Sequence, residues 1–275
     1  MQKLSAGLKQ EGRKIGFIPT MGYLHEGHIS LVNKSKSEND VTVTSIYVNP
    51  TQFGQNEDYG KYPRDFDRDN SILEKAGCDI LFYPEDSAIY PAGYQTYINV
   101  QEITKVLEGE FRPGHFTGVA TIVNILFNIV KPDRAYFGQK DAQQCAVIQQ
   151  MTLDLKLDVE IRVMPIVRER DGLAMSSRNK YLNEKERKDA LDLFRALSMA
   201  KGLIENGERN TELIEKKMME ILKSVDSSAP DYTRIVNSRS FDREQELREG
   251  VSYYLLIACR IGATRLIDNF LLTVN

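Results

Sequence analysis

The chain has 275 residues, 41% of them hydrophobic, and exceeds the ~100–150 residues of a usual single domain. Its 36 Lys and Arg residues nearly balance its 39 Asp and Glu residues, so the formal net charge is −3. Proteins that bind the phosphate backbone of nucleic acids usually carry a strongly basic surface. The composition therefore argues against a nucleic-acid partner and predicts two domains, or one large domain with an appendage.

Short apolar runs alternate with amphipathic helical patterns through the first part of the chain. The expected strands lie at 15–18, 41–48, 79–83, 134–137 and 159–164, and the expected helices at 27–37, 65–76, 117–130 and 140–154. Strands and helices that alternate in this way form a parallel sheet with crossover helices. The sequence therefore predicts an α/β fold with a Rossmann-like, doubly wound parallel sheet.

The pattern changes beyond about residue 167. Charged, amphipathic helices are expected at 183–206 and 210–224, and the stretch 227–230 is expected to break the pattern. Three strand-like runs follow, at 232–237, 253–260 and 265–272. Helices followed by strands favour an α+β arrangement. We therefore expect a Rossmann-like ligand-binding domain over residues 1–167 and a smaller C-terminal α+β lid domain over residues 168–275.

The three cysteines Cys78, Cys145 and Cys259 are odd in number, lie far apart and include no C-x-x-C pair. This usage is typical of reduced thiols in a cytoplasmic protein. The N-terminus carries no long apolar segment, and no run of about 18 apolar residues occurs anywhere. The sequence thus predicts a cytoplasmic protein that does not bind or cross a membrane.

The most informative motif contains His25 and His28, which follow the predicted strand 15–18 and open the predicted helix 27–37. Junctions between strand and helix are natural anion sites, and a phosphate could lie against both rings. Two alternatives remain: a pair of ordinary surface histidines, or a metal site. Zinc is the weaker alternative, because the only other histidine, His115, has no fixed spacing from the pair.

Amide side chains follow the predicted strand 41–48, at Asn49 and Gln52. Open α/β sheets bind ligands at the carboxyl ends of their strands, and amides offer both donors and acceptors to a hydroxylated or carboxylated ligand. Pro50 prevents simple continuation of a central strand. The alternative is an ordinary turn, since Asn-Pro is a common turn signal.

Lys140 follows Gly138 at the end of another predicted strand and lies near a predicted helix N-terminus. A positive charge there is unfavourable for the helix dipole but useful for phosphate binding, and such a local conflict favours a functional role. The neighbouring Asp141 has two equal interpretations, as an ordinary acidic residue at a helix N-terminus or as a residue at a nucleotide.

The segment after Asp171-Gly172 carries Ser176, Ser177 and Arg178. Asp-Gly marks a turn, and two hydroxyls with a planar guanidinium suit phosphate oxygens. By itself the segment also fits a polar linker between domains. Together with the two histidines and Lys140 it predicts a second phosphate clamp.

These motifs together resemble those of a known superfamily. The segment His25 to His28 resembles the histidine signature of the nucleotidylyltransferases, and Met175 to Arg178 resembles their mobile lysine-methionine-serine loop. Within that superfamily the chain is similar to the pantothenate synthetase family, and the resemblance spans nearly the whole chain. Five motifs carry it in the same order: Pro19 to His28, Asn49 to Phe53, Arg112 to Phe116, Gly138 to Asp141 and Met175 to Asn179.

The resemblance implies a ligase that joins pantoate to β-alanine, consumes ATP, uses Mg²⁺ and releases AMP and pyrophosphate. In such a reaction the pantoate carboxylate attacks the α-phosphorus to form pantoyl adenylate, and the amine of β-alanine then displaces AMP. No protein nucleophile is needed, so the enzyme aligns the reactants and stabilises charge on the phosphates. The resemblance also implies a homodimer.

The resemblance assigns roles to individual residues of this chain. The catalytic residues would be His28, as proton donor, with His25, Lys140 and Arg178 on the phosphates. The expected ATP-binding residues are Met21, Gly22, Tyr23, Leu24, His25, Glu26, Gly27, His28, Gly138, Gln139, Lys140, Asp141, Val167, Met175, Ser176, Ser177 and Arg178. Gln52 and Gln144 would hold pantoate, Asn49 would help β-alanine approach, and Asp69 is the candidate magnesium ligand beside the phosphates of ATP.

Three other functions are compatible with parts of the pattern. Another nucleotidylyltransferase would share the histidine motif but would give no reason for Gln52 and Gln144. A short aminoacyl-tRNA synthetase would need a basic appendage, which the charged helices expected at 183–224 do not clearly supply. A noncatalytic ATP-binding module would bind the nucleotide without turnover, and the histidines together with Lys140 and Arg178 weigh against it.

Overall fold

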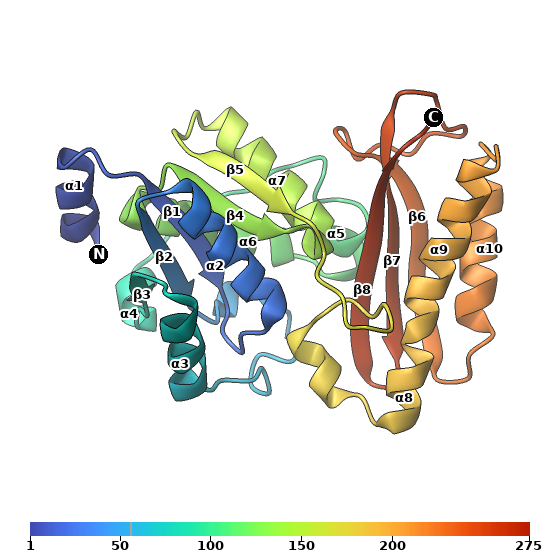
Figure 1. Cartoon of the computed structure of the whole chain (residues 1–275), viewed down its shortest axis with the longest axis horizontal. Helices are drawn as coiled ribbons and strands as arrows, with labels where there is room; N and C mark the ends of the chain where they lie inside the picture. The colour runs from blue at the N-terminus through green and yellow to red at the C-terminus, as the bar shows by residue number, and fades with distance from the viewer. Residues whose placement is uncertain (56) are drawn as a thin grey trace. The chain divides into compact units, whose positions relative to one another are not determined.

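The computed structural model describes residues 1–55 and 57–275 (Figure 1). The chain forms two compact units. The first unit comprises Met1–Gly138 and Gln144–Pro165, and the second comprises Gln139–Gln143 and Ile166–Asn275. These units differ from the predicted division after residue 167 at Gln139–Gln143 and at residues 166 and 167, and the predicted division into two domains stays a prediction.

A parallel sheet of five strands, in the order β3-β2-β1-β4-β5, forms the centre of the first unit. The strands are β1 (Ile15–Thr20), β2 (Val41–Ile46), β3 (Ile80–Phe82), β4 (Arg134–Gly138) and β5 (Glu160–Met164). The helices along this part of the chain are α1 (Gln2–Gln10), α2 (Glu26–Glu38), α3 (Phe66–Ala76), α4 (Asp86–Ile89), α5 (Glu108–Phe111), α6 (His115–Val130) and α7 (Ala142–Asp154), with the 3₁₀ turns η1 (Pro50–Gln52) and η2 (Gln139–Asp141). The predicted α/β fold class is confirmed, whereas α1, α4 and α5 were not predicted.

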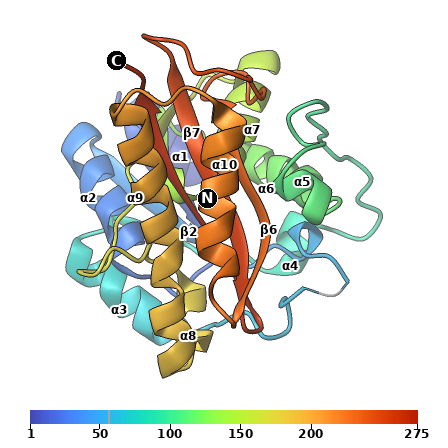
Figure 2. The ribbon, with the colours of Figure 1, turned by 90° about the vertical axis from the view of Figure 1, so that its right-hand side faces the viewer.

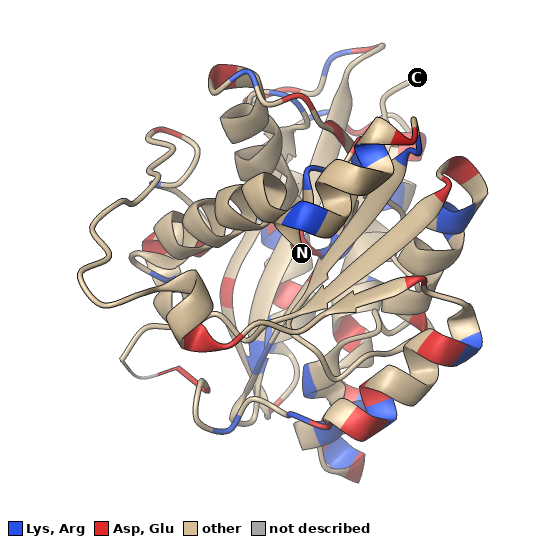
Figure 3. Ribbon diagram, turned by 90° about the vertical axis from the view of Figure 1, so that its left-hand side faces the viewer, with Lys and Arg blue, Asp and Glu red and all other residues tan. Residues whose placement is uncertain are grey.

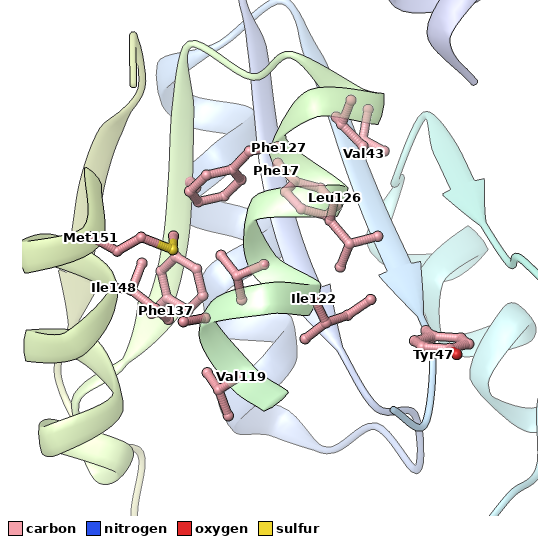
Figure 4. Close-up of a cluster of buried hydrophobic side chains, with 14 of the residues drawn as sticks. Phe17, Val43, Tyr47, Val119, Ile122, Leu126, Phe127, Phe137, Ile148 and Met151 are labelled. Atoms are coloured by element: carbon pink, nitrogen blue, oxygen red, sulfur yellow. The ribbon is translucent and has the colours of Figure 1, made fainter. Parts of the chain in front are cut away.

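Both faces of this sheet are covered, which explains why its strands are apolar runs without strict alternation. On one face, Phe17 of β1 packs against Phe127 of α6, with ring centroids 6.5 Å apart at an interplanar angle of 74° (Figure 4). On the other face, Ile18 of β1 packs in a cluster with Leu31 of α2 and Leu73 of α3. Neighbouring residues of β1 therefore point into two separate cores, and its carboxyl end is held firmly between them.

The second unit contains a three-stranded antiparallel sheet with the strand order β6-β7-β8. Its elements are η3 (Ser177–Tyr181), α8 (Glu184–Asp189), α9 (Leu191–Glu205), α10 (Thr211–Lys223), β6 (Ser228–Asn237), β7 (Ser252–Ile261) and β8 (Thr264–Thr273). Helices α9 and α10 lie side by side against one face of this sheet (Figure 2). The predicted smaller α+β fold of this region is confirmed.

Two bounds expected in the second unit were wrong. The helical pattern ends before 227–230 as expected, but the strand expected from residue 232 already begins at Ser228. Pro230 is tolerated there since β6 is an edge strand, and the register shifts between Pro230 and Tyr232. The helix expected over 183–206 is two helices that meet at Ala190.

Lys and Arg residues are interspersed with Asp and Glu residues along the ribbon drawn in Figure 3. The three cysteines are free thiols, as predicted. Among residues 1–55 and 57–275, no helix combines the length and apolar character that crossing a bilayer would require.

Candidate active site

The histidine motif lies where the strand order of the first sheet reverses. From β1 the chain moves outward to β2 and β3, then returns to form β4 on the opposite side of β1. The carboxyl ends at such a switch point form the usual ligand-binding crevice of a doubly wound sheet. The loop after β1 and the start of α2, which contain residues 21–28, follow one of these ends.

Two histidine rings cap helix α2 reciprocally. Nδ1 of His25, the N-cap residue, accepts a hydrogen bond of 3.1 Å from the backbone N–H of Gly27. Nδ1 of His28 accepts one of 3.2 Å from the backbone N–H of His25. The ring centroids lie 4.1 Å apart. This is a capping box in which two imidazoles replace the usual hydroxyl and carboxylate, and the three-residue spacing of the motif is what permits it.

The capping pattern defines the chemistry of both rings. Because Nδ1 of His25 and of His28 is an acceptor, the neutral form of each ring carries its proton on Nε2. Each ring therefore presents an N–H donor near the start of α2, where the helix dipole also favours an anion. Both side chains are half-buried. The arrangement suits a phosphate group, as the sequence predicted.

The same geometry weighs against a metal at the motif. A metal would need the lone pairs on Nδ1 of His25 and His28, and these already accept hydrogen bonds. In the part of the chain that the structure describes, no group of three His, Cys, Asp or Glu side chains is suited to hold a metal ion.

Glycine is required at two positions of the motif. A Cβ atom at Gly27 would lie 2.8 Å from Cε1 of His25, so a side chain there would displace the capping ring. Gly22 has a φ of +84°, and the following Tyr23 also has a positive φ of 50°. These two residues turn the chain sharply between β1 and α2, which requires an external anchor to hold the turn.

The anchor is Asp69 of α3, whose side chain is 1% exposed. One carboxylate oxygen accepts a hydrogen bond of 2.6 Å from the backbone N–H of Tyr23, and the other accepts one of 2.8 Å from that of Leu24. Arg68 adds a hydrogen bond from Nη2 to the carbonyl oxygen of Leu24, and its guanidinium lies 4.8 Å from the centre of the Tyr23 ring. Asp69 and Arg68 thus hold the strained loop that precedes the histidines.

Asn49 and Gln52 lie at the 3₁₀ turn η1, after β2, and both are buried. Oδ1 of Asn49 accepts hydrogen bonds from the hydroxyls of Thr51 and Tyr90, and its amide donates to the side chain of Gln52. Nε2 of Gln52 lies 3.0 Å from the sulfur of Met21. Gln52 and Met21, predicted separately as site residues, are therefore in contact, whereas Asn49 acts mainly as the cap and brace of the turn.

A chain of hydrogen bonds supports Gln52 from behind. Nδ1 of His115 lies 2.8 Å from the carbonyl oxygen of Gln52, and Nε2 of His115 lies 3.1 Å from Nη1 of Arg112. A carbonyl only accepts, so Nδ1 carries the proton and Nε2 accepts from Arg112. Burial and the neighbouring Arg112 lower the pKa of His115 to about 4, which keeps this ring neutral.

Arg112 is held in turn by Glu57. The carboxylate of Glu57 accepts hydrogen bonds of 2.8 Å from both Nε and Nη2 of Arg112. Burial acts to raise the pKa of Glu57, but the hydrogen bonds and the positive charge of Arg112 outweigh burial and keep this pKa below its usual range. The zinc alternative considered for His115 has no support in this geometry, since both ring nitrogens are engaged in this chain.

Gln144, the other expected pantoate ligand, lies in the first turn of α7 and is half-buried. It belongs to the first unit, together with Gln52 and the two histidines. The expected site residues in the second unit are Gln139–Asp141, Val167 and Met175–Arg178.

Lys140 lies in the 3₁₀ turn η2, immediately before α7, and not within the α-helix that the sequence predicted from residue 140. Its side chain is half-buried, and the adjacent Asp141 is exposed. The carbonyl oxygens of Gln139 and Lys140 both accept hydrogen bonds from the side-chain amide of Asn269. A residue 129 positions away in the sequence therefore defines the shape of this turn.

The segment 167–178 forms a hairpin-like loop followed by η3. The backbone N–H of Met175 donates to the carbonyl oxygen of Val167, and Arg168 pairs with Ala174 in an antiparallel bridge. The hydroxyl of Ser176 caps η3 by accepting from the backbone N–H of Arg178. Asn179 is the last residue of the corresponding motif, and its amide donates to the carbonyl oxygen of Ala174. The predicted clamp residues are thus part of a well-bonded loop.

Comparison with known proteins tests the family suggested by these motifs. A family model described as Pantoate-beta-alanine ligase matches residues 1–271. The chain belongs to the pantoate–β-alanine ligase family. This membership confirms the predicted family, and with it the predicted ligase function of joining pantoate to β-alanine.

Individual relatives agree with this family. Pantothenate synthetase from Caldicellulosiruptor saccharolyticus is 55% identical over 274 residues, which cover 100% of this chain and 97% of that protein. Pantothenate synthetase from Pseudothermotoga lettingae is 53% identical over 272 residues, which cover 99% of this chain and 96% of that protein.

Solved structures of this ligase family have the same fold. Pantothenate synthetase from Thermus thermophilus matches with a TM-score of 0.91 and 43% identity, covering 97% of this chain and 96% of that one. Pantoate–β-alanine ligase from Francisella tularensis, in complex with β-γ ATP and β-alanine, matches with a TM-score of 0.77 and 37% identity, covering 98% and 95%.

Proposed function

We propose that this ligase joins pantoate to β-alanine through a pantoyl adenylate and that ATP is the co-substrate. The observation that carries this proposal is the reciprocal histidine cap of α2. Its Nε2–H donors and the helix N-terminus form a site for phosphate and leave neither ring available as a nucleophile. A relative with bound β-γ ATP and β-alanine supports the choice of ligands.

The first step is attack by a carboxylate oxygen of pantoate on the α-phosphorus of ATP. A new P–O bond forms, the bond to the bridging oxygen breaks, and pyrophosphate leaves with the electron pair. Negative charge develops on the phosphate oxygens, and N–H donors positioned beforehand stabilise it without reorganisation. We assign this task to His25, His28, Lys140 and Arg178, with His28 as the proton donor.

The second step is attack by the amine of β-alanine on the acyl carbon of the adenylate. The C–N bond forms, the C–O bond to phosphate breaks, AMP leaves, and the nitrogen loses a proton. We assign Gln52 and Gln144 to pantoate, since amides can both donate and accept. Asn49 acts on this step indirectly, because its side chain braces the turn that carries Gln52.

The remaining assignments concern the nucleotide. We propose that Val167 contacts adenine through its backbone and that the phosphates are covered by the segment Met175–Arg178. We assign the other nucleotide contacts to Met21–His28 and to Gly138–Asp141.

Magnesium does not fit Asp69, which was the candidate ligand. Both carboxylate oxygens of Asp69 already accept backbone hydrogen bonds, and Nη1 of Arg68 lies 3.0 Å from one of them. A second cation so close to Arg68 would be unfavourable. We propose instead that the phosphates of ATP hold most of the magnesium coordination, because Mg²⁺ usually binds through substrate phosphates and waters.

We also propose a homodimer that acts in the cytoplasm. The free thiols of Cys78, Cys145 and Cys259 fit a reducing compartment. Sedimentation equilibrium of the purified chain at micromolar concentration tests the dimer, which a monomeric mass would refute.

Isotope exchange tests the two-step mechanism. The enzyme should exchange labelled pyrophosphate into ATP when pantoate is present and β-alanine is absent, because adenylate formation is reversible. Omission of pantoate is the control and should abolish the exchange. A protein that makes pantothenate but shows no such exchange would not use a free adenylate.

A further inference from the structure

Two consecutive polar residues of β8, Asp268 and Asn269, are almost completely buried, at 2% and 1% exposure. Neighbouring residues of a strand point to opposite faces, so an apolar strand rarely carries two buried polar residues in succession. Each of these side chains therefore needs hydrogen-bond partners on its own side of the sheet. These partners belong to segments to which the proposed function assigns phosphate contacts.

Asn269 binds the turn that carries Lys140. Its Nδ2 donates to the carbonyl oxygen of Gln139 at 2.9 Å and to that of Lys140 at 3.0 Å, and its Oδ1 accepts from Nε2 of Gln139 at 3.0 Å. One side chain thus uses both of its amide protons and its oxygen on this turn. These bonds define the backbone direction at Lys140, from which the lysine side chain extends.

Asp268 binds the loop that leads into Met175–Arg178. Its carboxylate accepts two parallel hydrogen bonds, of 2.7 and 2.8 Å, from the guanidinium of Arg168. The guanidinium of Arg168 also lies 4.9 Å from the centre of the Phe194 ring and 5.0 Å from the centre of the Phe270 ring. It also donates from Nη1 to the carbonyl oxygen of Gly172. A bidentate and stacked arginine leaves little freedom to the base of this loop.

The two contacts are joined through the strand itself. The backbone N–H of Asn269 donates to Oδ1 of Asp268 at 2.7 Å, and Nη2 of Arg168 donates to the carbonyl oxygen of Asn269 at 3.2 Å. Strand β8 also contacts both η2 and η3. The lysine turn and the loop before Arg178 are therefore tied to neighbouring residues of one strand, whose separation is set by the backbone.

We propose that Asp268 and Asn269 are positioning residues that hold Lys140 and the Met175–Arg178 segment at a constant separation, so that both meet one triphosphate. The proposal rests on the proposed roles of Lys140 and Arg178. Asn269 acts through Lys140, and Asp268 acts through Arg168 on the segment that ends at Arg178. Misplacement of reacting groups by about 1 Å can slow a reaction on the order of 10²-fold, so modest loosening of either contact would be costly.

A double-mutant cycle on pyrophosphate exchange tests this proposal. Asn269→Ala should lower kcat/KM for ATP by about 10- to 100-fold, with the KM for pantoate nearly unchanged. In a Lys140→Ala background the same substitution should have less than about a threefold effect, because the residue through which it acts is gone. Asp268→Asn should likewise lower kcat/KM for ATP by itself, and should have less than about a threefold effect in an Arg178→Ala background.

The matched control is Asn206→Ala. Asn206 also donates its amide to a carbonyl oxygen, that of Gly202, but on the exposed surface at the end of α9. This variant should retain wild-type kinetics. Amide hydrogen exchange, followed by mass spectrometry without substrates, should become faster at residues 139–141 in Asn269→Ala and stay unchanged in Asn206→Ala.

The outcomes separate this proposal from the proposed function. The positioning role alone is overturned if Asn269→Ala has wild-type kinetics. It is also overturned if this substitution lowers kcat/KM for ATP equally in the wild type and in Lys140→Ala. Absence of pantoate-dependent exchange in the wild type overturns the proposed function together with this inference. If Asn269→Ala does not fold, Asn269→Ser, which retains one donor, takes its place in the same cycle.

Discussion

Asp69→Asn replaces the carboxylate that anchors the loop before the histidines with an amide of the same size. The native carboxylate uses one oxygen for the N–H of Tyr23 and the other for that of Leu24. In the variant only one oxygen remains, and an NH₂ group must face a backbone N–H in a site that is 1% exposed. A hydrogen bond to a charged group contributes about 1.5–3 kcal/mol, and a buried unpaired donor costs about 1–3 kcal/mol.

We therefore expect Asp69→Asn to lower the free energy of unfolding by roughly 2–4 kcal/mol, and to lower the exchange rate by on the order of 10-fold or more because the histidines lose their support. Urea unfolding and pyrophosphate exchange measure the two effects. Asp67→Asn is the matched control, since Asp67 lies on the same helix and is exposed.

Dependence on magnesium concentration separates an anchor from a metal ligand. If Asp69 only anchors the loop, the magnesium concentration that gives half-maximal rate should be the same in Asp69→Asn as in the wild type. If Asp69→Asn keeps both the stability and the exchange rate of the wild type, the anchoring role of Asp69 is refuted. A large increase in the magnesium concentration that the variant needs would favour a role as metal ligand.

Three further predictions follow from the same geometry. His28→Ala and Lys140→Ala should each lower the exchange rate by on the order of 10²-fold, and near-normal rates in folded variants would contradict their assigned roles. Gly27→Ala should lower activity about tenfold because its Cβ would lie 2.8 Å from the capping ring, whereas Gly202→Ala, which meets no atom within 4 Å, should leave activity unchanged and not destabilise α9. The pKa of His115 is lowered to about 4 in the folded chain, so the unfolded chain binds the extra proton between about pH 4 and 6.5, and stability should fall as pH falls through that window. Urea unfolding at pH 7 and pH 4.5 should show a smaller loss for His115→Gln than for the wild type, by up to about 3 kcal/mol, and equal losses would contradict the assignment.

Local sequence was sufficient for most of the fold. The strands and long helices of the first unit were predicted within a few residues, because their apolar runs and their helical periodicity are properties of short segments. Elements of four residues, such as α4 and α5, carry too few periods to be recognised. The edge strand β6 was shortened in the prediction because Pro230 usually ends a strand, and only the sheet reveals that this strand lies at an edge.

The hydrogen bonds that hold the site residues in place could not be predicted from local sequence. Asp69 was considered as a magnesium ligand, and the structure instead has both of its oxygens on a loop 45 residues or more away in sequence. Arg112 and His115 were recognised as a family motif, but the chain of hydrogen bonds from Glu57 to Gln52 was not. The sequence carries a signal of such a supporting contact in β8, where two successive polar residues interrupt an apolar run.

The sequence by itself determined the family, the α/β fold class and the histidine pair at the start of a helix, because a three-residue spacing is enough to form the reciprocal cap of His25 and His28. Only the tertiary structure decided what holds the loop before them and how Asn269 shapes the turn of Lys140. The physical reason is the range of the interactions. Periodicity and capping act over a few residues and are visible in the sequence, whereas a buried polar side chain takes whichever partner the packed strands bring to it.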